Sequence, residues 1–145
     1  SEEAHVNGFD EGIFLTESGH VAEGSASNLF MVRGGKLVTP SPSDNILEGI
    51  TRATIIELAH DQLKMDVVER SIDRSELYVC DELFFTGTAV EISPIIKVDH
   101  RPVGLGEIGP LTRRIKDIYA NVTHGRVPQY NKWLVPAYQH QHALV

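Results

Sequence analysis

Three short segments of the sequence carry residues that can bind an anion or hold a charge. The first is "ILEGITR", residues 46–52, which runs directly into the helix-like stretch "ATIIELAHDQL". At a helix start the first backbone N–H groups have no intrahelical partner, and the helix dipole adds partial positive charge. Gly49 lets the backbone approach a ligand closely and Thr51 adds a hydroxyl, so the segment can bind a phosphate. The alternative is that Thr51 simply caps its own helix.

The second segment is "FFTGTAVEI", residues 84–92, where Thr86-Gly87-Thr88 interrupts an apolar strand at its end. Small and hydroxylated residues at a strand end can form a nest of N–H groups and hydroxyls for an anion. A β-bulge that re-aims the strand is the alternative interpretation.

The third segment is "VAEGSASNLF", in which Glu23 follows apolar residues. A carboxylate at the inner end of a strand is costly unless it meets a cationic or N–H partner, although Glu23 can also be an exposed turn residue. Taken together, two uncharged anion cradles and one carboxylate indicate a ligand with a phosphate at one end and a basic ring nitrogen at the other.

Other chemistries are not supported by the sequence. There is no serine–histidine–acid pattern, CxxC pair, GxxxxGK loop or GxGxxG fingerprint, and His140 and His142 fit a flexible tail better than a metal site. The net charge is −7 without a basic cluster, which argues against nucleic acid, and no apolar run approaches the ~18 residues of a membrane span. The single cysteine, Cys80, lies in an apolar run, which predicts a buried, inert thiol and a reducing compartment.

These segments need a framework of strands and helices, and 145 residues suffice for one domain. The first residues resemble the end of a helix, and "EGIFLTE" predicts a strand. Two further strands, joined by Gly34-Gly35, would complete a β-meander in the first forty residues. A helix over 51–63, a short strand in "DVVERSI", a short helix and strand in "DRSELYVCDELFFTG", a hairpin at 99–102 and a helix between Gly109-Pro110 and Gly125 follow. The order predicts a mixed α/β fold with largely antiparallel strands.

Four stretches together resemble the C-terminal half of a branched-chain amino-acid aminotransferase, a class IV, fold-type IV enzyme that depends on pyridoxal phosphate. They are "VAEGSASNLF", "ILEGITR", "DELFFTGTAVEISPI" and "GPLTRRIKDIYANVTHGRVPQYNKWLVPA". The resemblance runs from Glu3 to Pro136. It implies that residues 1–136 form the C-terminal cofactor-binding domain of a D-amino-acid-aminotransferase-like fold, and that 137–145 are a flexible tail.

The resemblance also implies roles at the phosphate end of the cofactor. Gly49, Ile50 and Thr51 would bind the phosphate through the helix N-terminus and the threonine hydroxyl. Thr88, beside Gly87, would complete the phosphate site from the end of its strand.

At the ring and substrate end, the resemblance assigns Glu23 to the protonated pyridine nitrogen. Leu47 would pack against the cofactor ring. The N–H groups of Thr88 and Ala89 would face the carboxylate of the substrate. No metal is implied.

One family feature is absent from these residues, namely the lysine that holds the cofactor as a Schiff base. In the family it precedes the stretch that matches "EEAHVNGFDE", and the lysines present do not match its position: Lys36, Lys64, Lys97, Lys116 and Lys132. The family's smaller N-terminal domain, with a phosphate-binding arginine and pocket aromatics, is absent too. The chain is therefore expected to be an inactive fragment by itself.

The complete enzyme would exchange the amino group of leucine, isoleucine or valine with 2-oxoglutarate in the cytoplasm. Its partners would be its own N-terminal domain and a second subunit, in at least a homodimer, and the fragment by itself is expected to associate or aggregate. A D-amino-acid aminotransferase or an aminodeoxychorismate lyase shares the same motifs and stays an alternative. A lysine-less module that binds pyridoxal phosphate or regulates a partner is a third possibility.

Overall fold

An antiparallel meander leads into the sheet in the computed structural model, which describes residues 2–24, 27–42, 49–87 and 90–133. A short helix precedes four strands: α1 (Glu2–Val6), β1 (Ile13–Leu15), β2 (Val21–Gly24), β3 (Asn28–Arg33) and β4 (Lys36–Thr39). Each strand pairs antiparallel with the next, and β3 turns into β4 at Gly34 and Gly35, whose φ angles are 58° and 75°. The predicted meander is confirmed, with three strands rather than two between residues 20 and 40.

The rest of the chain adds strands to this meander and covers it with helices. The elements are α2 (Ile50–Leu63), β5 (Val68–Glu69), the 3₁₀ helix η2 (Arg74–Tyr78), β6 (Glu82–Gly87), β7 (Glu91–Pro94), β8 (Lys97–Val98), β9 (Arg101–Pro102), α3 (Pro110–Thr123) and the 3₁₀ helix η3 (Pro128–Trp133). Strand β6 pairs antiparallel with β3 and β7, and β5 pairs parallel with β4. Within the described residues, seven strands form one sheet and β8–β9 form a separate hairpin, so the mixed α/β prediction is confirmed.

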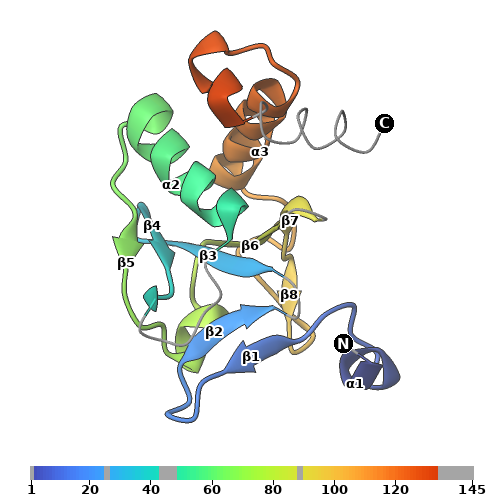
Figure 1. Cartoon of the computed structure of the whole chain (residues 1–145). Helices are drawn as coiled ribbons and strands as arrows, with labels where there is room; N and C mark the ends of the chain where they lie inside the picture. Colours follow the sequence, from blue (N-terminus) through green and yellow to red (C-terminus); the bar gives the residue numbers. More distant parts are fainter. Residues whose placement is uncertain (1, 25–26, 43–48, 88–89, 134–145) are drawn as a thin grey trace.

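Both faces of the central strands are buried. Helices α2 and α3 cover one face of the sheet (Figure 1). Phe30 and Phe84 lie on this face, and their rings stack with centroids 5.3 Å apart. Leu29 and Phe85 point to the opposite face and join a second core with η2. Alternate side chains of a strand point to opposite faces, so burial on both sides explains the nearly continuous apolar runs of β3 and β6. No helix in the described part of the chain is long and apolar enough to cross a membrane.

Helix α3 is fixed to the sheet by a carboxylate at its N-terminus. The buried Glu82 of β6 accepts hydrogen bonds from the N–H groups of Thr112 (2.8 Å) and Leu111 (3.2 Å). A negative charge at this end of a helix is favourable, because the N–H groups there are unpaired and the dipole is positive. Gly109, the N-cap residue, lies so close that a Cβ would come within 2.1 Å of Glu82.

Removing this capping carboxylate should destabilise the fold. We expect Glu82→Ala to lower the free energy of unfolding by about 1–2 kcal/mol, because two N–H groups lose their acceptor. Gly109→Ala should cost at least as much, since its φ of −76° suits alanine but its methyl group would displace the Glu82 carboxylate. Urea unfolding of both single variants and the double variant provides the test. Both substitutions should act by removing the Glu82 carboxylate from the start of α3, so losses that simply add in the double variant would contradict this explanation. Glu107→Ala, at an exposed position, is the control.

On the opposite face of the sheet, the carboxylate of Glu76 in η2 binds two arginine side chains. The carboxylate accepts a bidentate pair of hydrogen bonds from Arg70 (2.8 and 3.0 Å), one from Arg33, and one from the N–H of Asp73 (2.8 Å). The Arg70 hydrogen bonds, aided by those from Asp73 and Arg33, outweigh burial and lower the pKa of Glu76 to about 2. The network ties η2 to β3 and to the segment after β5.

This lowered pKa predicts an acid-sensitive contribution to stability. Because the folded-state pKa lies below that of the unfolded chain, the contribution is complete above about pH 4.5 and is lost as the pH falls towards 2. We expect Glu76→Gln to cost about 2 kcal/mol at pH 7 and much less near pH 2. Urea unfolding across this pH range measures the difference. An equal loss at both pH values would contradict the assignment.

Candidate functional site

A row of polar residues crosses the sheet beneath the helices. Glu23 of β2 pairs with Asn28 of β3, and Asn28 pairs on its other side with Thr86 of β6. Directly opposed residues of antiparallel strands have their side chains on the same face. That face is the one covered by α2 and α3, because Phe30 and Phe84 lie two residues along from Asn28 and Thr86. The register therefore brings three polar residues from separate strands into one line.

Helix α2 begins over the middle of this row. Its N-cap is Gly49, with extended φ and ψ of −88° and 147°, and a Cβ on Gly49 would lie 2.6 Å from Oδ1 of Asn28. Glycine is thus needed here for close approach, and not for an unusual backbone angle. The interpretation in which Thr51 caps its own helix is wrong, because Thr51 is already the second helical residue and is buried.

The N-terminus of α2 has the electrostatic character of an anion site. Its first turn, from Ile50 to Ala53, contains no acidic residue, and the glycine cap offers no side-chain acceptor. Helix α3, on the same face, instead receives the carboxylate of Glu82. A helix N-terminus without an acidic residue attracts negative charge through its N–H groups and its dipole.

A buried hydroxyl lies in the same row. Thr86 is 0% exposed, and its Oγ1 has no hydrogen-bond partner among the described residues. An unpaired buried hydroxyl is costly, so a native structure that retains one calls for a ligand or another partner. Together, this hydroxyl and a helix start whose first turn contains no acidic residue suit a phosphate group.

The structure brings together part of the set predicted from the sequence. Glu23 and Gly49 both adjoin Asn28, and Glu23 is half-buried within β2, so the exposed-turn interpretation is wrong. Ile50, 80% exposed, and the buried Thr51 form the start of α2. Gly87 ends β6, where residues 84–87 pair regularly with β7, which excludes a β-bulge within that range. Leu47, Thr88 and Ala89 lie outside the described residues.

The sequence does not single out Asn28 or Arg52 as parts of the site, whereas Thr86 belongs to the second candidate segment, Thr86-Gly87-Thr88. Asn28 could have been recognised from the sequence. It opens the apolar run "NLFMV", and its amide needs a hydrogen-bond partner if that strand is buried. Arg52 carried another signal, since a cation in the first turn of a helix opposes the dipole. Neither signal shows which face of the sheet the residue occupies.

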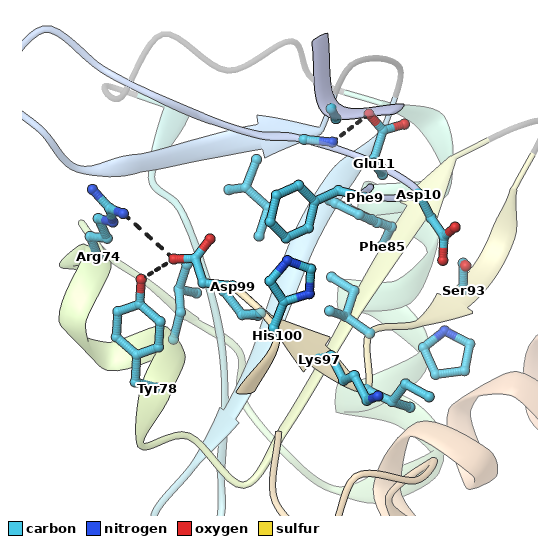
Figure 2. Close-up of a pocket in the computed structure, with 18 of the residues that line it drawn as sticks. Phe9, Asp10, Glu11, Arg74, Tyr78, Phe85, Ser93, Lys97, Asp99 and His100 are labelled. Carbon is cyan, nitrogen blue, oxygen red and sulfur yellow. Dashed lines mark hydrogen bonds and ion pairs between the residues drawn. The ribbon is translucent and has the colours of Figure 1, made fainter. Parts of the chain in front are cut away.

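A separate cavity of about 750 Å³ lies on the opposite face of the sheet (Figure 2). In its lining, the Phe9 ring stacks on His100 with centroids 4.4 Å apart, and the Tyr78 hydroxyl donates a hydrogen bond to Asp99. Phe85 also lines the cavity, and it points away from the face that holds Thr86. The cavity is therefore distinct from the polar row.

Metal and thiol chemistry receive no support from the described residues. No group of three or more His, Cys, Asp or Glu side chains there is arranged to hold a metal ion. Cys80 is buried and donates to the carbonyl of Leu77, and burial raises the pKa of its thiol to about 11. The prediction of a buried, inert thiol is confirmed.

Comparison with known proteins agrees with this geometry. The family model described as amino-transferase class IV matches residues 1–98. A probable branched-chain-amino-acid aminotransferase of Aquifex aeolicus is 49% identical over 136 residues, which cover 94% of this chain and 44% of that protein.

Solved structures agree as well. The PLP form of the Thermobaculum terrenum branched-chain amino acid aminotransferase is 47% identical and superposes with a TM-score of 0.89, covering 92% of this chain and 43% of that one. The branched-chain aminotransferase of Thermoproteus uzoniensis, solved with norvaline, is 47% identical, with a TM-score of 0.86 over 91% of this chain and 43% of that one. The chain thus spans less than half the length of these relatives, and it belongs to the amino-transferase class IV family.

Proposed function

We propose that this chain forms the cofactor-phosphate-binding part of a pyridoxal-phosphate-dependent transaminase. The complete protein would move the amino group between branched-chain L-amino acids and 2-oxoglutarate. The observation that carries the proposal is the start of α2, whose first turn contains no acidic residue and which lies on Asn28. The same row holds the hydroxyl of Thr86, which has no hydrogen-bond partner among the described residues. The 47% identity to an enzyme solved in its PLP form supports the choice of cofactor.

On this proposal, the phosphate binds at the beginning of α2. The N–H groups of Ile50 and Thr51 and the Thr51 hydroxyl donate to it, and Gly49 allows the close approach. Thr86 contributes a donor from β6, next to Gly87. The role of Thr88 in completing this site rests on the family resemblance alone.

Glu23 would act at the other end of the cofactor, because it shares a face with Asn28 and Thr86. Its carboxylate would hold a proton at the pyridine nitrogen. When bound, pyridoxal phosphate supplies a ring that accepts the electrons released at the α-carbon of the amino acid, and a protonated nitrogen strengthens that effect. The packing role of Leu47 and the contacts of Thr88 and Ala89 with the substrate carboxylate follow from the resemblance only.

The Schiff-base lysine would come from sequence outside these residues. Lys36 lies at the β3–β4 hairpin, Lys64 is the C-cap of α2, Lys97 is in β8, and Lys116 is in α3. None of these four belongs to the polar row. The residues that select the substrate side chain would lie outside the chain as well.

The proposal includes further protein surfaces that complete the site. Several large apolar side chains are exposed at α1, at β1, at the start of α2 and before β8: Val6, Phe14, Leu15, Ile50 and Ile96. Large exposed apolar side chains lose contact with water when another protein surface covers them. We therefore expect the N-terminal domain and a second subunit to cover part of this chain, in a cytoplasmic homodimer or larger oligomer.

A chimera tests the activity. This chain would replace the matching 43% of the Thermobaculum terrenum enzyme, which supplies the remaining sequence. We expect transfer from leucine to 2-oxoglutarate, and a fall in kcat of about 100-fold with Glu23→Gln, which cannot hold the ring proton. Preference for D-alanine, or lyase activity on aminodeoxychorismate, would contradict the branched-chain assignment. A folded chimera that binds the cofactor without any turnover would favour a binding or regulatory module.

Phosphate recognition can be tested on the cofactor-free form of the same chimera. We expect it to bind pyridoxal phosphate more tightly than pyridoxal, which lacks the phosphate. Gly49→Ala should weaken binding of pyridoxal phosphate about tenfold, because the methyl group pushes α2 away from Asn28. Ala53→Ser, at an exposed position of the same helix, is the matched control. Equilibrium dialysis measures both affinities, and equal affinity for the two ligands would contradict the phosphate site.

A further inference from the structure

Arg52 is a buried cation in the first turn of α2. The residue is 3% exposed and is the third of the helix, close to the end where the dipole is already positive. A cation at this position is disfavoured by the dipole, and burial of a charge is costly unless it is paired. The buried charge of Arg52 therefore needs an acceptor or a negative charge from another part of the chain.

The contacts of Arg52 tie the start of α2 to two strand ends. Its Nη2 donates to the carbonyl of Pro40 (3.2 Å) and to Oε1 of Glu69 (2.5 Å). Pro40 directly follows β4, and Glu69 of β5 is the parallel partner of Thr39. One guanidinium thus bridges a helix and two strands.

These strand ends are in turn fixed to β3. The buried hydroxyl of Thr39 donates to the carbonyl of Leu29 (2.7 Å), and Leu29 is the neighbour of Asn28 in that strand. A continuous series of contacts therefore runs from Arg52 through the end of β4 to the strand that carries Asn28. The first turn of α2 is held from two sides, by Arg52 at the end of β4 and by the approach of Gly49 to Asn28.

The two partners of the Arg52–Glu69 ion pair differ in burial. Its side chain is almost completely buried, whereas that of Glu69 is 43% exposed, so water screens part of the negative charge. The Nε of Arg52 is also buried without a hydrogen-bond partner among the described residues. The start of α2 thus holds a buried guanidinium paired with a partly exposed carboxylate, whereas the start of α3 holds the carboxylate of Glu82.

We infer that Arg52 is a positioning residue for phosphate binding, an inference that rests on the function proposed above. Its guanidinium fixes the first turn of α2 against the ends of β4 and β5, and its charge adds to the field that holds the anion. Its Nη2 contacts are with Pro40 and Glu69, so it acts through the helix and is not assigned as a ligand.

Comparison of pyridoxal phosphate with pyridoxal in the cofactor-free chimera tests this role. Arg52→Met keeps an unbranched chain but removes the charge and the donors, so affinity for pyridoxal phosphate should fall about tenfold and affinity for pyridoxal less than about twofold. Arg52→Lys restores the charge without the planar fork and should recover part of the phosphate preference. Arg113→Met, at an exposed position in the first turn of α3, is the matched control and should change neither affinity.

The outcomes separate the inference from the function on which it rests. If the unaltered chimera does not prefer pyridoxal phosphate, the proposed phosphate site is wrong. If it does, and folded Arg52→Met keeps the same preference or loses both affinities equally, Arg52 has only a structural role and the inference is overturned. If circular dichroism shows that Arg52→Met does not fold, Arg52→Lys provides the test. A preference of Arg52→Lys for pyridoxal phosphate over pyridoxal equal to that of the unaltered chimera would then overturn the inference.

In the active chimera, the same variant should separate cofactor affinity from turnover. Arg52→Met should raise the concentration of pyridoxal phosphate needed for half-maximal rate, while kcat at saturating cofactor stays within about twofold. A fall in kcat at saturation without a change in cofactor requirement would contradict a positioning role at the phosphate.

Discussion

The contact between Gly49 and Asn28 is the constraint on which the candidate site depends. It fixes where α2 begins relative to the sheet, since the start of the helix lies directly over a buried strand residue. Any side chain at position 49 would separate them. Because Asn28 also pairs with Glu23 and with Thr86, the same contact sets the relation between the helix end, a carboxylate and a buried hydroxyl from three strands.

Two helices cover one face of the sheet, and different groups lie at their N-termini. Helix α3 receives a carboxylate from β6, so its end is neutralised within the chain. Helix α2 has a glycine cap, no acid in its first turn and a buried arginine instead. Both ends have a positive dipole and N–H groups without intrahelical partners, so the difference lies in the groups that meet them. The first arrangement stabilises the fold, and the second leaves an attraction for an anion from outside the described chain.

Local sequence signals predicted most of the elements because they depend on neighbouring residues. Gly34-Gly35 specifies a tight hairpin, the spacing of Ile55, Leu58 and Ala59 specifies a helix with one buried face, and Gly109-Pro110 specifies a helix start. One local difference remains between the sequence signals and the structure. The sequence indicates two strands between residues 20 and 40, whereas the structure has three, because β2 and β3 are separate strands that pair with each other.

The sequence by itself determined the kinds of element, the chemical types of residue available and, through its resemblance, the family to which the chain belongs. Tertiary structure decided which of those residues meet. Whether Glu23, Asn28 and Thr86 share a face depends on the register between strands, and a shift by one residue would send a side chain to the other face. Likewise, only packing shows that Gly49 rather than Thr51 caps α2, and that Arg52 is buried against Pro40 and Glu69, because these contacts join segments distant in sequence.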